Sequence, residues 1–170
     1  LIEFVQGRAV GNPFYVIELI HALKESGLLK DEQGQWRVAR PLHEAGIPAT
    51  VQGVLSSRVD RLEAFRRRTL QEASVIGKSF LYEILKRITE HKECLDESLL
   101  ELETVDFLQH QEVQADIVYI FKHALAQEVV YNGLLQKDRR MIHERIAQVI
   151  ERIFADRLPE FYETLATHYM

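Results

Sequence analysis

The sequence has little cysteine, little proline and no long apolar run. Among 170 residues there are one cysteine, Cys94, and four prolines. A single cysteine excludes a disulfide within the chain and suits a reducing, cytoplasmic compartment. Because no run of about eighteen apolar residues occurs, we expect neither a membrane span nor a membrane partner. Residues 1–4 include no initiator methionine and no basic signal start, and a helical pattern continues to the last residue. We therefore expect a fragment of a larger cytoplasmic protein.

Hydrophobic residues make up 46% of the chain and charged residues 28%, which is enough for one domain-sized core or two small modules. The net charge of -5 argues mildly against a nucleic-acid-binding surface.

Helical periodicity dominates. It predicts a helix over residues 14–26, capped by Asn12, with Pro13 in its first turn and Gly27 at its exit. Residues 28–38 predict a short β-hairpin, and residues 41–48 an irregular connector.

From residue 50 the pattern predicts a succession of helices. One ends at Gly77, and the next, over residues 81–88, has Ser79 as its cap. The period then changes to that of a strand over residues 117–121, preceded by a turn or another strand, before helices resume. Short helices followed by a two-stranded hairpin are typical of a winged helix. The expected fold class is thus mainly α, with short hairpins.

No catalytic or metal site is predicted. Residues 77–79, Gly-Lys-Ser, resemble the end of a phosphate-binding loop, but Glu72 stands where that loop needs a glycine. A helix-to-helix turn is the favoured interpretation there. His91 and Cys94 lack the further ligands that zinc requires. We expect no enzyme activity from this chain alone.

Basic clusters are interpreted as solvated helix faces. This applies to Arg66, Arg67 and Arg68, and to His143 with its neighbours Arg139, Arg140 and Arg145. A winged helix could bind DNA, but residues 93–106 hold six acidic residues and no lysine or arginine. The helix predicted over residues 81–88, which carries Lys86 and Arg87, is a weaker candidate for a DNA-recognition helix. Nucleic acid is therefore a disfavoured partner.

Two short features allow both a structural and a functional interpretation. The start Asn12-Pro13-Phe14 can serve only to begin a helix, or its rigid proline can pack on a flat ring. His123, where a strand gives way to a helix, can cap the turn or bind an anion together with the helix N-terminus.

These features occur in segments that resemble one family. Residues 11–19, Gly-Asn-Pro-Phe-Tyr-Val-Ile-Glu-Leu, resemble the Gly-Asn-Pro-Phe-x-x-x-Glu-Leu signature of bacterial STAND ATPases, AAA-related modules fused to nucleotide cyclases, kinases and transcriptional activators. Residues 47–62, 73–80 and 121–131 resemble later segments of that family, in the same order. The similarity covers roughly residues 1–150.

The resemblance implies a lid with a β-hairpin over residues 1–46, a winged helix over 47–136, and a linker leading into a tetratricopeptide-like superhelix over 137–170. It also implies an upstream P-loop domain that binds ADP or ATP with Mg²⁺. Pro13 would lie against the adenine, flanked by Asn12 and Phe14. His123 would touch the β-phosphate, although the acidic residue that follows it in relatives is replaced by Ala124.

The resemblance suggests a bistable switch. Nucleotide would clamp the lid and winged helix onto the P-loop domain, and exchange would free them to oligomerise and signal. Without a P-loop, the chain alone is expected neither to hydrolyse ATP nor to bind it tightly. The alternatives are a winged-helix DNA-binding module and a helical interaction scaffold.

Overall fold

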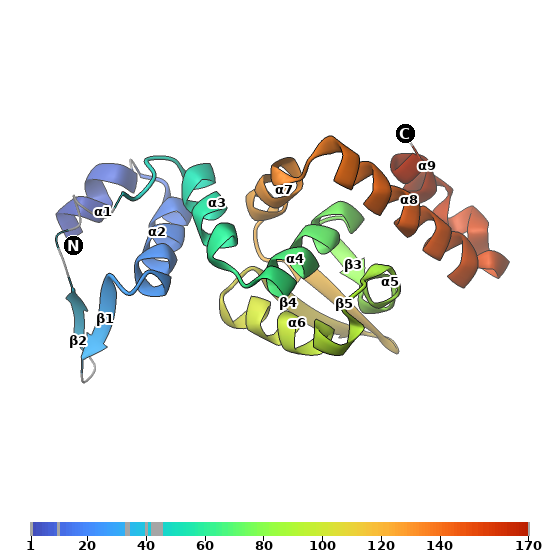
Figure 1. Ribbon diagram of the computed structural model, residues 1–170, viewed down its shortest axis with the longest axis horizontal. Coiled ribbons are helices and arrows are strands. Elements are labelled where there is room, and N and C mark those ends of the chain that lie inside the picture. The colour runs from blue at the N-terminus through green and yellow to red at the C-terminus, as the bar shows by residue number, and fades with distance from the viewer. Residues whose placement is uncertain (1, 10, 33–34, 40, 42–45, 170) are drawn as a thin grey trace. The chain divides into compact units, whose positions relative to one another are not determined.

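The computed structural model describes residues 2–9, 11–32, 35–39, 41 and 46–169. The described part of the protein is mainly helical and contains two small antiparallel sheets (Figure 1). The chain divides into two compact units, Leu1–Leu62 and Glu63–Met170, and each is considered separately. Within the described residues, no helix combines the length and the apolar character needed to cross a bilayer.

The first unit contains three helices and one hairpin in its described part. These elements are α1 (Ile2–Ala9), α2 (Pro13–Glu25), β1 (Leu29–Glu32), β2 (Gln35–Val38) and α3 (Val51–Arg61). The strands pair antiparallel from Leu29–Val38 to Glu32–Gln35, which confirms the predicted hairpin, while the predicted turn residue Gly34 lies outside the described residues.

Helix α2 begins and ends as its sequence predicts. The Asn12 side chain accepts hydrogen bonds from the amides of Phe14 and Tyr15 at 3.0 and 3.3 Å. Pro13 occupies the first helical position, where its missing amide hydrogen costs nothing. Gly27, at φ 66°, supplies the left-handed backbone that carries the chain away from the helix.

Helix α3 packs on α2 and closes the core of the first unit. Leu19 and Leu23 of α2 and Val54 of α3 are fully buried in this core. Thr50 caps α3 by accepting a hydrogen bond from the Gly53 amide at 3.1 Å. Because α3 belongs to this core, the compact unit extends to Leu62, beyond the boundary expected near residue 46.

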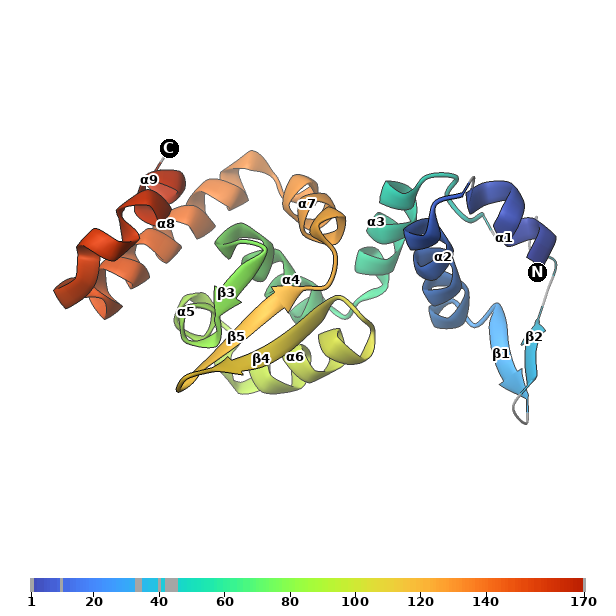
Figure 2. The ribbon, with the colours of Figure 1, turned by 180° about the vertical axis from the view of Figure 1, so that it is seen from behind.

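The second unit contains a three-stranded antiparallel sheet with the strand order β3-β5-β4. Figure 2 shows β5 lying between the other two strands. Strands β4 and β5 form the predicted hairpin, pairing from Leu108–Phe121 to Val113–Asp116. The elements of this unit are α4 (Ala64–Ile76), β3 (Ser79–Leu81), α5 (Tyr82–Ile88), a 3-10 turn (Lys92–Cys94), α6 (Leu95–Thr104), β4 (Leu108–Val113), β5 (Asp116–Phe121), α7 (Ala124–Gly133), α8 (Gln136–Ile153), a 3-10 segment (Ala155–Phe161) and α9 (Tyr162–Tyr169).

The segment after Gly77 differs from the prediction. Ser79 does not cap a helix: it begins strand β3 and pairs with Ile120 of β5. The expected helix-to-helix turn is therefore a helix-to-strand connection, which Gly77 makes with φ 145°. The extended backbone buries Phe80 against Phe121, with ring centroids 6.3 Å apart. Burial of this aromatic side chain explains why a strand forms here.

Gly53 provides a test of the packing around α3. A Cβ at this position would lie 2.7 Å from the Pro48 Cβ. A Cβ added to Gly7 of α1 would have no atom of another part of the structure within 4 Å. We expect Gly53→Ala to lower the free energy of unfolding by about 1–3 kcal/mol, because the clash outweighs the better helix propensity of alanine. The measurement is urea unfolding followed by fluorescence of Trp36, the one tryptophan in the sequence, which lies in the first unit.

Gly7→Ala is the matched control. It should leave stability unchanged or raise it by up to about 1 kcal/mol. Equal effects of the two substitutions would contradict the close approach of Gly53 to Pro48.

Candidate functional site

Pro13 is exposed at the start of α2. Asn12 and Pro13 are exposed and Phe14 is half-buried. The turn before them is closed by a hydrogen bond of 2.8 Å from the Asn12 amide to the Ala9 carbonyl. On the next residue, the Tyr15 hydroxyl donates to the Pro48 carbonyl at 3.0 Å. These contacts fix the proline ring in place while leaving it accessible.

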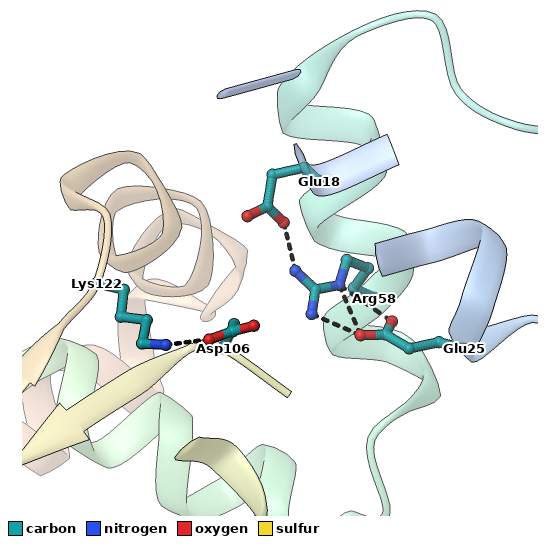
Figure 3. Close-up of polar contacts among 5 residues, drawn as sticks. All are labelled: Glu18, Glu25, Arg58, Asp106 and Lys122. Carbon is teal, nitrogen blue, oxygen red and sulfur yellow. Dashed lines mark hydrogen bonds and ion pairs between the residues drawn. The ribbon is translucent and has the colours of Figure 1, made fainter. Parts of the chain in front are cut away.

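His123 lies at the junction of β5 and α7, as predicted. It occupies the N-cap position of α7 with extended backbone (φ -133°, ψ 130°), and its carbonyl accepts the amide of Ala126 at 3.1 Å. Its half-buried side chain makes no capping hydrogen bond to α7. The imidazole therefore does not cap the N-terminus of α7. The neighbouring Lys122 forms an ion pair with Asp106 (Figure 3).

The predicted nucleotide contacts thus come from both units. Asn12, Pro13 and Phe14 belong to the first unit and His123 to the second. Joint contact of these residues with one nucleotide stays a prediction.

A buried charge cluster joins α2 to α3, and sequence reasoning missed it. Arg58 of α3 is 1% exposed and Glu18 of α2 is 2% exposed. The Arg58 guanidinium donates through Nη1 to Glu18, and through Nε to both carboxylate oxygens of Glu25 at 2.9 and 3.0 Å (Figure 3). Burial alone would lower the pKa of Arg58, but Glu25 and Glu18 raise it overall, so the guanidinium stays charged.

The arginines of α4 take part in ion pairs rather than forming a solvated face. Arg66 pairs with Glu63 at 3.0 Å and with Glu101 of α6. Arg68 lies 3.2 Å from the fully buried carboxylate of Glu72. Burial raises the pKa of Glu72, and Arg68 opposes that rise. The solvated-face prediction is wrong for Arg66 and Arg68, because both side chains are partly buried and pair with carboxylates.

His143 is also not on a solvated face. Its Nδ1 lies 2.7 Å from Nδ1 of His168 in α9, and its Nε2 lies 3.1 Å from the Tyr131 hydroxyl. Helix α9 covers this face of α8, which explains why the prediction failed. Burial and the proximity of His143 lower the pKa of His168 to about 4, so His168 is neutral at pH 7. Burial, followed by the charge of Arg139, lowers the pKa of His143.

Potential metal ligands do not gather in the described part of the chain. Histidine, cysteine, aspartate and glutamate side chains form no group of three or more there that could hold an ion. Glu72, which the sequence placed at the glycine position of a phosphate-binding loop, lies inside α4.

No protein-family model matches the chain. The chain is similar to "Uncharacterized protein R02095" of Rhizobium meliloti (strain 1021), with 24% identity over 144 residues. The aligned region covers 84% of this chain but 13% of that protein, so the chain corresponds to a small part of its relative.

Arg58 should be essential for the stability of the first unit. We expect Arg58→Leu to lower the free energy of unfolding by about 3–5 kcal/mol, because it leaves the buried Glu18 carboxylate without its partner. Urea unfolding followed by Trp36 fluorescence measures the effect.

Arg61→Leu is the matched control, since Arg61 is exposed on the same helix. This change should shift stability by no more than about 0.5 kcal/mol. The importance of the cluster is refuted if the two substitutions destabilise the unit equally.

Docking of α9 should weaken in acid. The unfolded His168 binds a proton below about pH 6.5, whereas in the folded state its pKa is about 4. The unfolded segment therefore binds more protons across this range, and stability falls as the pH falls. We expect α9 to be less protected by about 2 kcal/mol at pH 5 than at pH 8. Amide hydrogen exchange, corrected for intrinsic rates, measures this difference.

His168→Leu serves as the control and should remove most of the pH dependence, leaving the contribution of His143. Identical protection of α9 in the wild-type protein at both pH values would be inconsistent with the buried, neutral histidine.

Proposed function

We propose that this chain is the lid and winged-helix region of a STAND-type nucleotide switch. In this proposal the chain has no catalytic centre. It helps to sequester ADP or ATP, bound with Mg²⁺ by a P-loop domain elsewhere in the same polypeptide, and it transmits the nucleotide state to an output. The output would be a cyclase, a kinase or a transcriptional activator, as in the family that the motifs resemble.

The observation that carries the proposal is the exposed Pro13 within the Gly-Asn-Pro-Phe motif. A proline whose only role is to begin a helix does not need to be exposed, because it could do so equally well beneath other side chains. Here the Asn12 cap and the Tyr15–Pro48 hydrogen bond fix its position, and the ring remains accessible. A fixed apolar ring of this kind suits contact with a flat base.

The second unit supports the winged-helix assignment. Helices α4, α5 and α6 precede the β4–β5 hairpin, which would be the wing, and β3 pairs with β5 as the third strand. His123 follows the wing directly, at the N-terminus of α7, where helix amides and an imidazole favour an anion. Helices α8 and α9 would then lead into the tetratricopeptide-like superhelix.

The acidic residues around α6 favour this switch over a DNA-binding role. Glu101 pairs with Arg66, Asp106 with Lys122, and Glu103 lies 2.6 Å from His110 Nδ1. These pairs occupy Arg66 and Lys122, basic side chains that contact with a phosphate backbone would need. We propose a cytoplasmic protein whose partners are its own P-loop and superhelical domains, and which oligomerises when activated.

Nucleotide affinity tests the proposal in the full-length polypeptide. We expect Pro13→Ala and His123→Ala each to weaken ADP binding by about tenfold, which corresponds to about 1.4 kcal/mol of lost contact. Isothermal titration calorimetry with ADP and Mg²⁺ gives the affinities, and circular dichroism checks that both variants fold.

Pro41→Ala and His110→Ala are matched controls, because both residues are exposed in the described structure and lie outside the motifs. These controls should bind ADP as the wild type does. Unchanged ADP affinity in both the Pro13 and His123 variants would favour the scaffold alternative and count against the switch. Tight, salt-sensitive binding of duplex DNA would favour the DNA-binding alternative.

A further inference from the structure

We propose that a cavity between α7, α8 and α9 of the second unit binds a small phosphate-bearing anion. The cavity has a volume of about 700 Å³. Its polar lining comes from all three helices and includes Tyr131, Gln136, Arg139, Arg140, Glu144 and Thr167, together with the histidine pair His143 and His168. This site lies within one compact unit and is independent of the nucleotide switch proposed above.

The charge of the cavity favours an anion. Arg139 and Arg140 bring two positive charges, and Glu144 brings one negative charge. The Glu144 carboxylate already accepts a hydrogen bond from Gln148, one turn further along α8, at 3.4 Å. His143 and His168, which also line the cavity, are neutral at pH 7, because burial lowers the pKa of both rings. The arginines thus set a positive balance that does not depend on histidine protonation.

The Arg139 guanidinium stacks on Tyr131 and has one donor without an acceptor. Its guanidinium carbon lies 4.9 Å from the centre of the Tyr131 ring, a distance at which a cation stacks on an aromatic face. Its Nε is buried and has no hydrogen-bond partner within the described structure. A buried N–H without an acceptor costs free energy. The Nε is closed to solvent, so an oxyanion in the cavity would accept its hydrogen bond only after the guanidinium turns outward.

The N-terminus of α8 adds further donors on the same side. This helix runs for 18 residues from Gln136, and no side chain caps it at Leu135. Its first-turn amides and its dipole therefore favour negative charge near Gln136. Donors from two arginines and a helix start suit the several oxygens of a phosphate better than one planar carboxylate. The volume lies within the range of small-molecule sites.

Pyrophosphate binding to the 170-residue chain tests the site. We expect a Kd below about 1 mM at constant ionic strength, together with a shift of the Arg139 Nε–H resonance in ¹⁵N NMR spectra. Arg139→Gln and Arg140→Gln should each weaken binding by about tenfold, because each removes one charge-assisted contact. Arg140 is exposed, so its variant remains informative if the Arg139 variant fails to fold.

Arg152→Gln is the matched control, since it removes the same charge from the other end of α8. It should change the affinity less than twofold. Equal weakening by Arg152→Gln, or no resonance shift at Arg139, would overturn the site in favour of diffuse electrostatics. Citrate binding as tightly as pyrophosphate would overturn the phosphate assignment. Because this test uses neither ADP nor a P-loop domain, its result is separate from that of the switch.

Discussion

A buried arginine between two carboxylates organises the first unit. Arg58 is almost fully removed from water, and such a charge is tolerated only when good hydrogen bonds replace its solvation. Glu18 and Glu25 of α2 provide these bonds and so hold α3 against α2. The same packing places Pro48 where it accepts the Tyr15 hydroxyl, next to the start of α2. The position of Pro13 thus follows from an ion cluster that lies further along the same helix.

Charge pairing also shapes the second unit. Carboxylates from α4 and α6 hold Arg66 and Arg68, and Glu72 receives a second arginine, Arg145 of α8, at 3.5 Å. The Arg66–Glu101 and Arg145–Glu72 pairs use acidic side chains to join helices. The face of α8 that carries Arg139 is different: an aromatic ring supports its guanidinium, and the cavity beside it is open.

Sequence patterns among neighbouring residues predicted the caps and hairpins. They could not predict contacts between residues far apart in the chain. The Asn12 cap and the two hairpins depend on neighbouring residues, so their sequence patterns were sufficient. Strand β3 was missed because it is only three residues long and forms by pairing with a strand far along the chain. The Glu18–Arg58 and His143–His168 contacts join residues 40 and 25 positions apart, which periodicity cannot relate. Both residues of the first pair do lie in the family-like motifs, and that was the available signal.

The central claim is that this chain closes over a nucleotide held by a P-loop domain of the same polypeptide. The most direct test is an experimental structure of the full-length protein with ADP bound. The account predicts the Pro13 ring against the adenine and His123 beside the β-phosphate. A nucleotide that contacts neither residue, or a full-length protein without a phosphate-binding loop, would contradict it.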